Sequence, residues 1–169
     1  AQERGGELAV ELIHNAGRAG SNQDSAQLRR AVAVFREYQT KAAAAGGGAV
    51  QVLTNTNGVA EQANRLLQPL VLPQVLDGTT PRLERKCGAP FVLKDRVVCT
   101  ETVDGDDARI YNGTLGTICV VDGGKKTFVV QFDDGNKYTY SAGTFGVKHS
   151  YCMTVHRSQG SEYQYVVVL

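Results

Sequence analysis

Apolar residues recur along the chain with two different periods. Residues 25–45 and 59–70 have apolar positions three or four apart, which predicts helices. Residues 7–18 show the same spacing over a shorter stretch, and a helix is predicted there as well. Residues 50–54 are a short apolar run followed by an Asn-rich turn, which predicts a strand. A strand, a polar turn and a helix in this order are typical of the βα unit of a parallel sheet.

The pattern changes after residue 90. Short apolar runs at residues 96–99, 114–121, 127–132 and 137–140 predict strands, because Gly-containing turns separate them. Asn112-Gly113 is a hairpin-type turn. Strands at this spacing predict a small β-barrel over residues 91–147. The α/β pattern then returns, with a helix predicted at residues 149–158 and a strand at 165–169.

The predicted fold class is therefore α/β with a partial parallel-sheet domain and an inserted small β-barrel. Residues 1–90 would form the first part of the α/β domain, 91–147 the insertion, and 148–169 the return to the α/β domain. The chain starts without Met and stops on an apolar run, so we expect a fragment of a longer protein.

Composition excludes several classes of protein. Hydrophobic residues make up 42% and charged residues 21%, which is typical of a globular chain. The formal net charge is +1, so nucleic-acid binding would have to depend on local charge. The four cysteines form no C-x-x-C pair, which argues against a zinc ribbon. No apolar run is long enough to cross a bilayer. Reduced thiols would suit a cytoplasmic or nuclear location.

The sharpest chemical pattern is residues 154–162, which read T-V-H-R-S-Q-G-S-E. Gly160 lets backbone come close to a ligand, and the hydroxyl and amide side chains around it can bond phosphate oxygens. The string resembles motif V of RecD-like superfamily 1 helicases, in which T-V-H-K-S-Q-G-S-E is typical. Arg157 replaces the usual Lys and keeps its charge. Against this resemblance, a single His in a helix is more often packed or solvated than functional.

The resemblance implies a role for each part of the string. Thr154 and His156 would face single-stranded DNA, with Arg157 and Ser158 beside them. The nucleotide-facing residues would be Gln159, Gly160 and Glu162, with the Glu162 carboxylate accepting a hydrogen bond from a ribose hydroxyl.

A second segment resembles the same family. Residues 51–54 read Q-V-L-T and residues 63–68 read A-N-R-L-L-Q, similar to the family's Q-V-L-T-P…L-N-x-x-L-Q around motif IV. Asn55 stands where Pro is usual. Thr54 and Asn55 are candidates for contacting backbone phosphate, because α/β sheets place ligands at the carboxyl ends of their strands. The equally weighted alternative is a turn whose side chains satisfy local amides.

The predicted barrel carries a third match. Residues 94–99, K-D-R-V-V-C, and 111–116, Y-N-G-T-L-G, resemble the G-D-R-V-M…F-N-G-D-x-G pattern of the family's SH3-like insertion. Lys94 stands where Gly is usual. Gly113 and Gly116 would bracket a tight turn. In relatives this insertion lies beside the strand path and supports duplex separation; the alternative is a barrel that only braces the domain.

The ATP machinery is incomplete in this sequence. No G-x-x-x-x-G-K-[ST] phosphate loop occurs, and the nearest stretch, residues 123–127, is predicted to be a turn between strands. No acidic pair follows an apolar strand. ATP with Mg would therefore have its main ligands in a missing N-terminal RecA-like domain, and the chain alone would hydrolyse no ATP. The predicted function is part of an ATP-dependent DNA helicase; the alternatives are a stand-alone or vestigial nucleic-acid-binding module and a protein-interaction module.

Overall fold

In a computed structural model, the structure describes residues 9–13, 21–85, 88–104, 109–141, 143, 146–159 and 161–169, with backbone alone for 9 and 21–25. The chain divides into two compact units, Ala1–Ala63 with Cys152–Leu169, and Asn64–Tyr151. Across these described ranges, no helix combines the length and apolar character needed to span a membrane.

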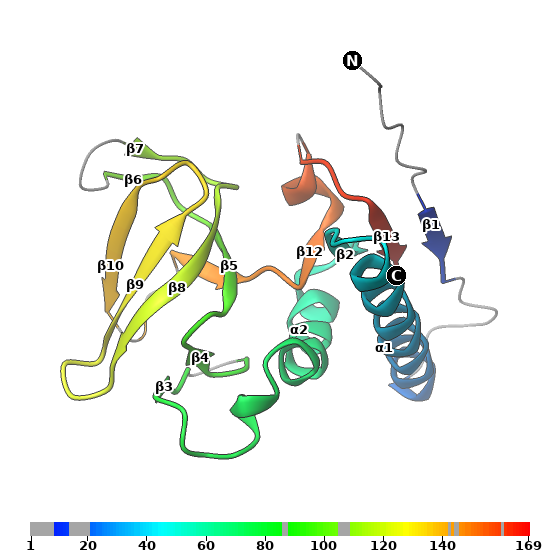
Figure 1. The fold of residues 1–169 in the computed structure, drawn as a ribbon, viewed down its shortest axis with the longest axis horizontal. Helices are drawn as coiled ribbons and strands as arrows, with labels where there is room; N and C mark the ends of the chain where they lie inside the picture. Colours follow the sequence, from blue (N-terminus) through cyan, green and yellow to red (C-terminus); the bar gives the residue numbers. More distant parts are fainter. Residues whose placement is uncertain are drawn as a thin grey trace. The chain divides into compact units, whose positions relative to one another are not determined.

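The first unit is built on a parallel sheet. Its strands are β1 (Ala9–Leu12), β2 (Val50–Thr54), β12 (Cys152–Thr154) and β13 (Tyr165–Val168). They lie in the order β1-β13-β2-β12, and all three pairings are parallel (Figure 1). Helix α1 (Ser21–Ala44), the first part of α2 (Asn57–Val71) and the 3₁₀ turn η2 (Val155–Ser158) complete the unit. This arrangement confirms the predicted α/β class.

Helix α1 packs against β2 and β13 through one apolar side. Its buried residues recur every three or four positions, as expected for one face of a helix: Leu28, Ala31, Val34, Phe35, Tyr38 and Ala42. The Tyr38 ring lies 5.2 Å from the ring of Tyr165 in β13. The Tyr38 hydroxyl donates a hydrogen bond to the Glu11 carboxylate of β1 at 3.4 Å. The helix is therefore fixed to the sheet by both apolar and polar contacts.

The other face of the sheet is covered less completely by the described residues. Because side chains alternate along a strand, Val166 and Val168 point away from α1 when Tyr165 and Val167 point toward it. In register with them, Val10 and Leu12 of β1 are 51% and 58% exposed. This second face is apolar and partly open to solvent.

The second unit is built on an antiparallel sheet. Strands β5 (Arg96–Cys99), β8 (Leu115–Asp122), β9 (Thr127–Phe132), β10 (Lys137–Ser141) and β11 (Val147–His149) lie in the order β10-β9-β8-β5-β11. Two short pairs accompany it, β3 (Arg82–Leu83) with β4 (Phe91–Val92) and β6 (Val103–Asp104) with β7 (Arg109–Ile110). A 3₁₀ turn, η1 (Pro73–Val75), precedes them. The sheet curls around its own core (Figure 1), which is compatible with a small barrel-like insert.

Every second residue of β9 points into the core of this curled sheet. Phe128, Val130 and Phe132 of β9 are 1%, 0% and 1% exposed, whereas the residues between them are only half-buried. The Phe128 ring lies 4.9 Å from Phe91 and 5.4 Å from Tyr140. Aromatic rings at these separations add favourable contacts beyond the area that they bury.

The two glycines predicted to bracket a tight turn have different roles in the structure. Gly113 has φ +96°, which favours glycine, and it lies in the predicted Asn112-Gly113 turn. Gly116 instead lies in β8, where an added Cβ would be 2.7 Å from Val130 Cγ1 and 2.9 Å from the Gln131 carbonyl oxygen. Gly116 is thus required by close strand packing. Lys94, where the helicase family usually has Gly, has φ 72°, which is the left-handed conformation that glycine adopts most easily.

Asp95 is the buried polar centre of the second unit. Its carboxylate is 0% exposed and accepts the backbone N–H of Val92 at 2.7 Å and the Tyr151 hydroxyl at 2.8 Å. The Gln68 amide of α2 donates to the same carboxylate at 2.8–2.9 Å. Burying a charge is costly unless it is well hydrogen-bonded, and here both oxygens have donors.

His149 extends this network. The Arg85 guanidinium lies 3.3 Å from His149 Nδ1, and Asp95 Oδ2 lies 3.1 Å from Nε2. Arg can only donate, so His149 Nδ1 is the acceptor in the Arg85 contact, and Nε2 faces both Asp95 Oδ2 and the Gln68 amide, 3.3 Å away. Asp95 therefore ties α2, the turn before β5 and the residues around β11 together.

Two predicted elements differ from the structure. The helix predicted at residues 149–158 is wrong: β11, β12 and η2 occupy this stretch, because it lies within or beside two sheets. The helix predicted at residues 7–18 is also wrong where the structure describes it, since β1 pairs with β13 there. The helix predicted at residues 59–70 is confirmed as α2, which contains Pro69. The strand at residues 50–54 and those at 96–99 and 127–132 are confirmed with the predicted bounds.

Replacing Asp95 with Ala should destabilise the protein strongly. Val92, Tyr151 and Gln68 would lose the carboxylate to which they donate, and breaking a buried charged network typically costs about 3–5 kcal/mol. The free energy of unfolding is measured by urea denaturation followed by circular dichroism. The control is Asp104→Ala, which removes an exposed carboxylate paired with Arg109 at 3.1 Å and should cost less than about 1 kcal/mol. Equal losses in the two variants would contradict the assigned role of Asp95.

Candidate nucleic-acid and nucleotide site

The two segments with helicase-like motifs meet at one edge of the parallel sheet. Strand β2 ends at Thr54 and strand β12 ends at Thr154, and these two residues are register partners in a parallel pair. The residues that follow both strands therefore emerge side by side at the carboxyl edge of the sheet. This edge is where α/β sheets commonly bind ligands.

The residues after β12 form a single 3₁₀ turn that exposes polar side chains. His156 is exposed, Arg157 and Ser158 are half-buried, and Val155 is 47% exposed. The Ser158 hydroxyl donates to the Val155 carbonyl at 2.9 Å, and the Ser161 N–H donates to the Ser158 carbonyl at 3.1 Å. The chain is thus folded back on itself here by local bonds, with His156 at the surface.

The residues after β2 begin helix α2. Thr54 is 1% exposed, so its side chain lies beneath the surface, whereas Asn55 is exposed. The Thr56 hydroxyl accepts the N–H of Val59 at 3.3 Å, which caps the helix. The free N–H groups and positive dipole at a helix start favour anions. The edge therefore combines Asn55 and a helix start with the turn that carries His156.

A pocket of about 400 Å³ lies beside the same turn. Its lining combines apolar residues from the second face of the sheet with polar residues of the crossover to β13: Leu53, Ser158, Ser161, Glu162, Tyr163 and Val166. The volume falls in the range of small-ligand pockets, and an apolar floor with few polar groups is typical of them.

Two polar groups of this unit, the Tyr163 hydroxyl and the Cys152 thiol, are buried. The Tyr163 hydroxyl is buried and has no hydrogen-bond partner in the described part of the chain. An unpaired buried hydroxyl costs about 1–3 kcal/mol, so a ligand or water that bonds to it would be stabilised. Burial also raises the pKa of the Cys152 thiol, at the start of β12, to about 12. Strand β12, which leads into the motif string, therefore begins in the buried core of the unit.

The predicted nucleotide residues are only partly described. Gln159 and Glu162 are exposed on either side of Gly160. Gly160 itself lies outside the described residues.

The described residues do not fit the triphosphate and metal of an ATP site. They contain no group of three or more His, Cys, Asp or Glu side chains that could hold a metal ion. Residues 123–126 form the turn between β8 and β9, as predicted, and not a strand-to-helix phosphate loop.

Sequence reasoning did not identify the pocket. Leu53 and Val166 look like ordinary strand residues, and only the crossover from β12 to β13 places Tyr163 near them. The one available signal was the aromatic residue directly after the motif string. It gave no indication that the Tyr163 hydroxyl is buried and unpaired.

No family profile and no curated protein matches the chain. Among solved structures, a Pif1 helicase from Bacteroides in complex with ADP-AlF3 and ssDNA is similar, with 13% identity and a TM-score of 0.49 over 70% of this chain and 34% of that chain. A structure of two coordinating Pif1 helicases that unwind forked dsDNA has 15% identity and a TM-score of 0.49 over 70% and 32%. Bacteroides sp Pif1 in complex with ADP-AlF4 has 12% identity and a TM-score of 0.42 over 85% and 42%. The chain thus spans less than half the length of these Pif1 chains.

Stability should fall at alkaline pH because of Cys152. Its thiol has a pKa of 9.0 when unperturbed and about 12 in the folded protein. Between these values the unfolded chain loses a proton that the folded chain keeps, so the free energy of unfolding decreases by about 1.4 kcal/mol per pH unit. Burial also raises the pKa values of Tyr140 and Tyr151, and they act in the same direction.

The measurement is the urea midpoint between pH 8 and pH 11. Cys152→Ala should flatten the decline above pH 9, whereas Cys119→Ala, at an exposed cysteine, should leave it unchanged. A Cys152→Ala protein that declines as steeply as the parent would show that this thiol is not protected by burial.

Proposed function

We propose that the chain is part of an ATP-dependent DNA helicase of the RecD-like superfamily 1 type, and that its first unit grips single-stranded DNA. The observation that carries this proposal is the parallel pairing of Thr54 with Thr154. Two segments that separately resemble helicase motifs are far apart in the chain, yet they end at one sheet edge. If the two segments resembled helicase motifs only by chance, there would be no reason for them to end side by side.

The grip would act on the DNA backbone. Asn55, Thr154, His156 and Ser158 offer amide, hydroxyl and imidazole groups, which bond phosphate and sugar without reading bases. Arg157 adds the positive charge that a phosphate chain favours. Thr54 lies beneath this surface and holds Asn55 at the end of β2. A helicase needs this kind of contact, because it must step along any sequence.

The nucleotide would lie on the other side of the motif turn. Gln159, Gly160 and Glu162 would form one wall of the ATP cleft, with Glu162 accepting a hydrogen bond from a ribose hydroxyl. The phosphates and Mg would have their ligands in a further, N-terminal RecA-like domain. The chain alone therefore hydrolyses no ATP in this proposal, and closure of two domains on ATP would change the spacing of their grips on DNA.

The curled sheet of the second unit would be the SH3-like insertion, spanning residues 91–147 within a RecA-like domain formed by residues 1–90 and 148–169. The network around Asp95 joins the residues of this unit to one another. A nucleic-acid-binding module without any ATPase partner is the second candidate, because small barrels of this kind bind nucleic acids and proteins alike. A phosphate loop encoded upstream in the same reading frame would distinguish the helicase from the module.

Substitutions in the motif turn should weaken single-strand binding. We expect His156→Ala and Arg157→Gln together to lower affinity for an oligothymidine about thirtyfold at low salt, because each of the two polar or charged contacts contributes about 1 kcal/mol. Fluorescence anisotropy measures the affinity. The slope of log affinity against log salt concentration should decrease by about one, which corresponds to the loss of one phosphate contact.

Lys137→Gln is the matched control, since it removes one exposed positive charge from β10 in the second unit. It should change affinity by less than about twofold. If the parent chain does not bind oligothymidine at low salt, or the motif variant binds as tightly as the control, the proposed grip is wrong.

A further inference from the structure

The imidazole ring of His149 is buried inside the second unit. His149 is 2% exposed, and its ring lies 4.8 Å from the Phe91 ring and 6.1 Å from the Tyr151 ring. In ordinary surroundings a histidine gains its charge between about pH 8 and about pH 5. Because a buried ring cannot turn toward water, the groups that face its two nitrogens decide what this charge does to the structure.

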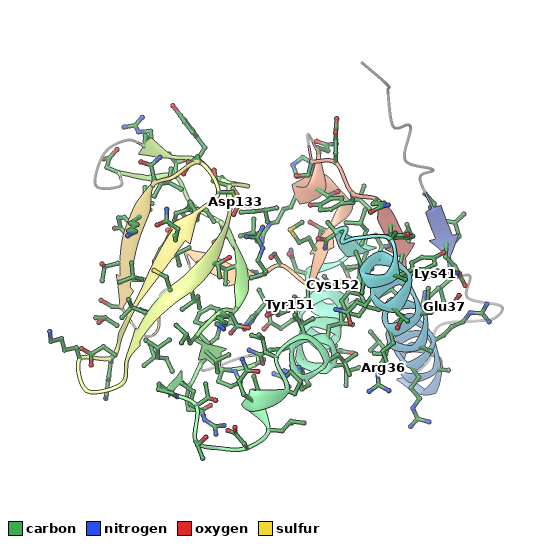
Figure 2. All side chains as sticks on the ribbon, in the orientation of Figure 1. Arg36, Glu37, Lys41, Asp133, Tyr151 and Cys152 are labelled. Atoms are coloured by element: carbon green, nitrogen blue, oxygen red, sulfur yellow. The ribbon has the colours of Figure 1, made fainter. Side chains whose placement is uncertain are left out.

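The polar groups around the ring come from each element packed against it. Nδ1 faces the Arg85 guanidinium of the chain after β3 at 3.3 Å. Nε2 faces the Asp95 carboxylate before β5 at 3.1 Å and the Gln68 amide of α2 at 3.3 Å. The Tyr151 side chain (Figure 2) donates its hydroxyl to Asp95, and burial and that carboxylate raise the pKa of the hydroxyl, so it stays a neutral donor. Among the described side chains, the charged groups that face the ring are therefore one carboxylate and one guanidinium.

The two sides of the ring respond in opposite ways to protonation. A protonated imidazole carries a hydrogen on each nitrogen. The hydrogen on Nε2 faces the Asp95 carboxylate, which attracts the charged ring. The hydrogen on Nδ1 faces Arg85, which is itself positive and has no acceptor atom. Like charges repel strongly in a poorly solvated interior, so the contact with Arg85 requires an unprotonated Nδ1.

Arg85 is the partner that can move away from the ring. It is half-buried, whereas Asp95 is 0% exposed and accepts the Val92 N–H at 2.7 Å. The Arg85 guanidinium also lies 4.6 Å from the centre of the Phe91 ring, and Phe91 pairs with Leu83 in the β3–β4 pair. That pair has only two register positions, so few other bonds hold it. A guanidinium that leaves His149 for solvent therefore weakens the attachment of β3.

We propose that Arg85 and His149 form a latch that acid opens, in which protonation of the ring releases the guanidinium and loosens the β3–β4 pair. At neutral pH the uncharged ring accepts a hydrogen bond from Arg85 and holds the chain after β3 in place. In mild acid the protonated ring keeps the Asp95 carboxylate and loses Arg85. The curled sheet remains folded, because its core is formed largely by apolar side chains. No residue of the latch belongs to the proposed grip, so either proposal can fail without the other.

The test is a titration of the complete, isotope-labelled 169-residue chain between about pH 8 and about pH 5. Ring nitrogen chemical shifts report whether His149 Nδ1 carries a hydrogen. Amide exchange, corrected for its intrinsic dependence on pH, reports on β3 and β4. We expect an unprotonated Nδ1 at the alkaline end. As the ring takes up its proton, the protection of β3 and β4 amides should fall about tenfold, the effect of losing one charged hydrogen bond, while β9 stays protected.

Three variants sharpen the result. In Arg85→Gln the amide can donate to an unprotonated Nδ1 and accept from a protonated one, so the protection of β3 and β4 should no longer depend on pH. Arg85→Lys keeps a cation that can only donate, so its response should resemble that of the parent chain. The matched control is Arg109→Gln, which removes an exposed guanidinium from β7 and should leave the response unchanged.

Several outcomes would overturn the proposal. One is a His149 ring whose protonation is the same at both ends of the titration. Another is protection of β3 and β4 that does not change while the ring becomes protonated. A third is an Arg85→Gln chain that responds as steeply as the parent. Loss of protection in β9 together with β3 and β4 would also contradict the latch, because it would show that acid unfolds the whole unit and does not release one segment.

Discussion

The parallel pairing of β2 with β12 is the interaction on which the candidate site depends. Cys152, Met153 and Thr154 lie in register with Val52, Leu53 and Thr54. Because the strands run in the same direction, both end at one edge, and the turn η2 emerges beside the start of α2. Antiparallel pairing or a register shift would separate Asn55 from His156, and these residues could then not contact the same ligand.

The burial of this strand pair explains its rigidity. Val52 and Cys152 are 0% and 1% exposed, and α1 covers β2 on one face. The other face carries the pocket beside Glu162 and Tyr163. The sheet therefore presents two different surfaces: a polar carboxyl edge, and an apolar pocket beside a buried hydroxyl that has no hydrogen-bond partner in the described part of the chain. The second unit has its own rigid centre in Asp95, whose carboxylate is surrounded by donors.

Local patterns predicted the elements that depend on local constraints. The alternation at residues 127–132 and the apolar run at 50–54 lead directly to β9 and β2, because each has one consistent period. Residues 149–158 were predicted as a helix, but they are two short strands and a turn. Their conformation is set by partners far away in the chain, Val97 for His149 and Val52 for Cys152. β1 was missed for the same reason, since its partner is β13.

The candidate site likewise combines features that local sequence predicts with features that depend on distant parts of the chain. The residues of the motif string and of the Asn-rich turn were identifiable from their chemistry and resemblance. Their convergence was not predicted, because residues 152–154 were expected in a helix and not in a strand that pairs with β2. The pocket was not predicted, because it forms only once the crossover from β12 to β13 is placed. Asp95 was visible as part of a motif, but its complete burial was not.

The most direct test of the account is a titration of isotope-labelled chain with oligothymidine, followed by amide chemical shifts. The account predicts that the largest shifts cluster at Thr54, Asn55 and the turn from Thr154 to Ser158, while residues of β9 and β10 remain unchanged. Shifts confined to the second unit, or spread evenly over exposed lysines and arginines, would contradict the claim that the paired ends of β2 and β12 form a nucleic-acid grip.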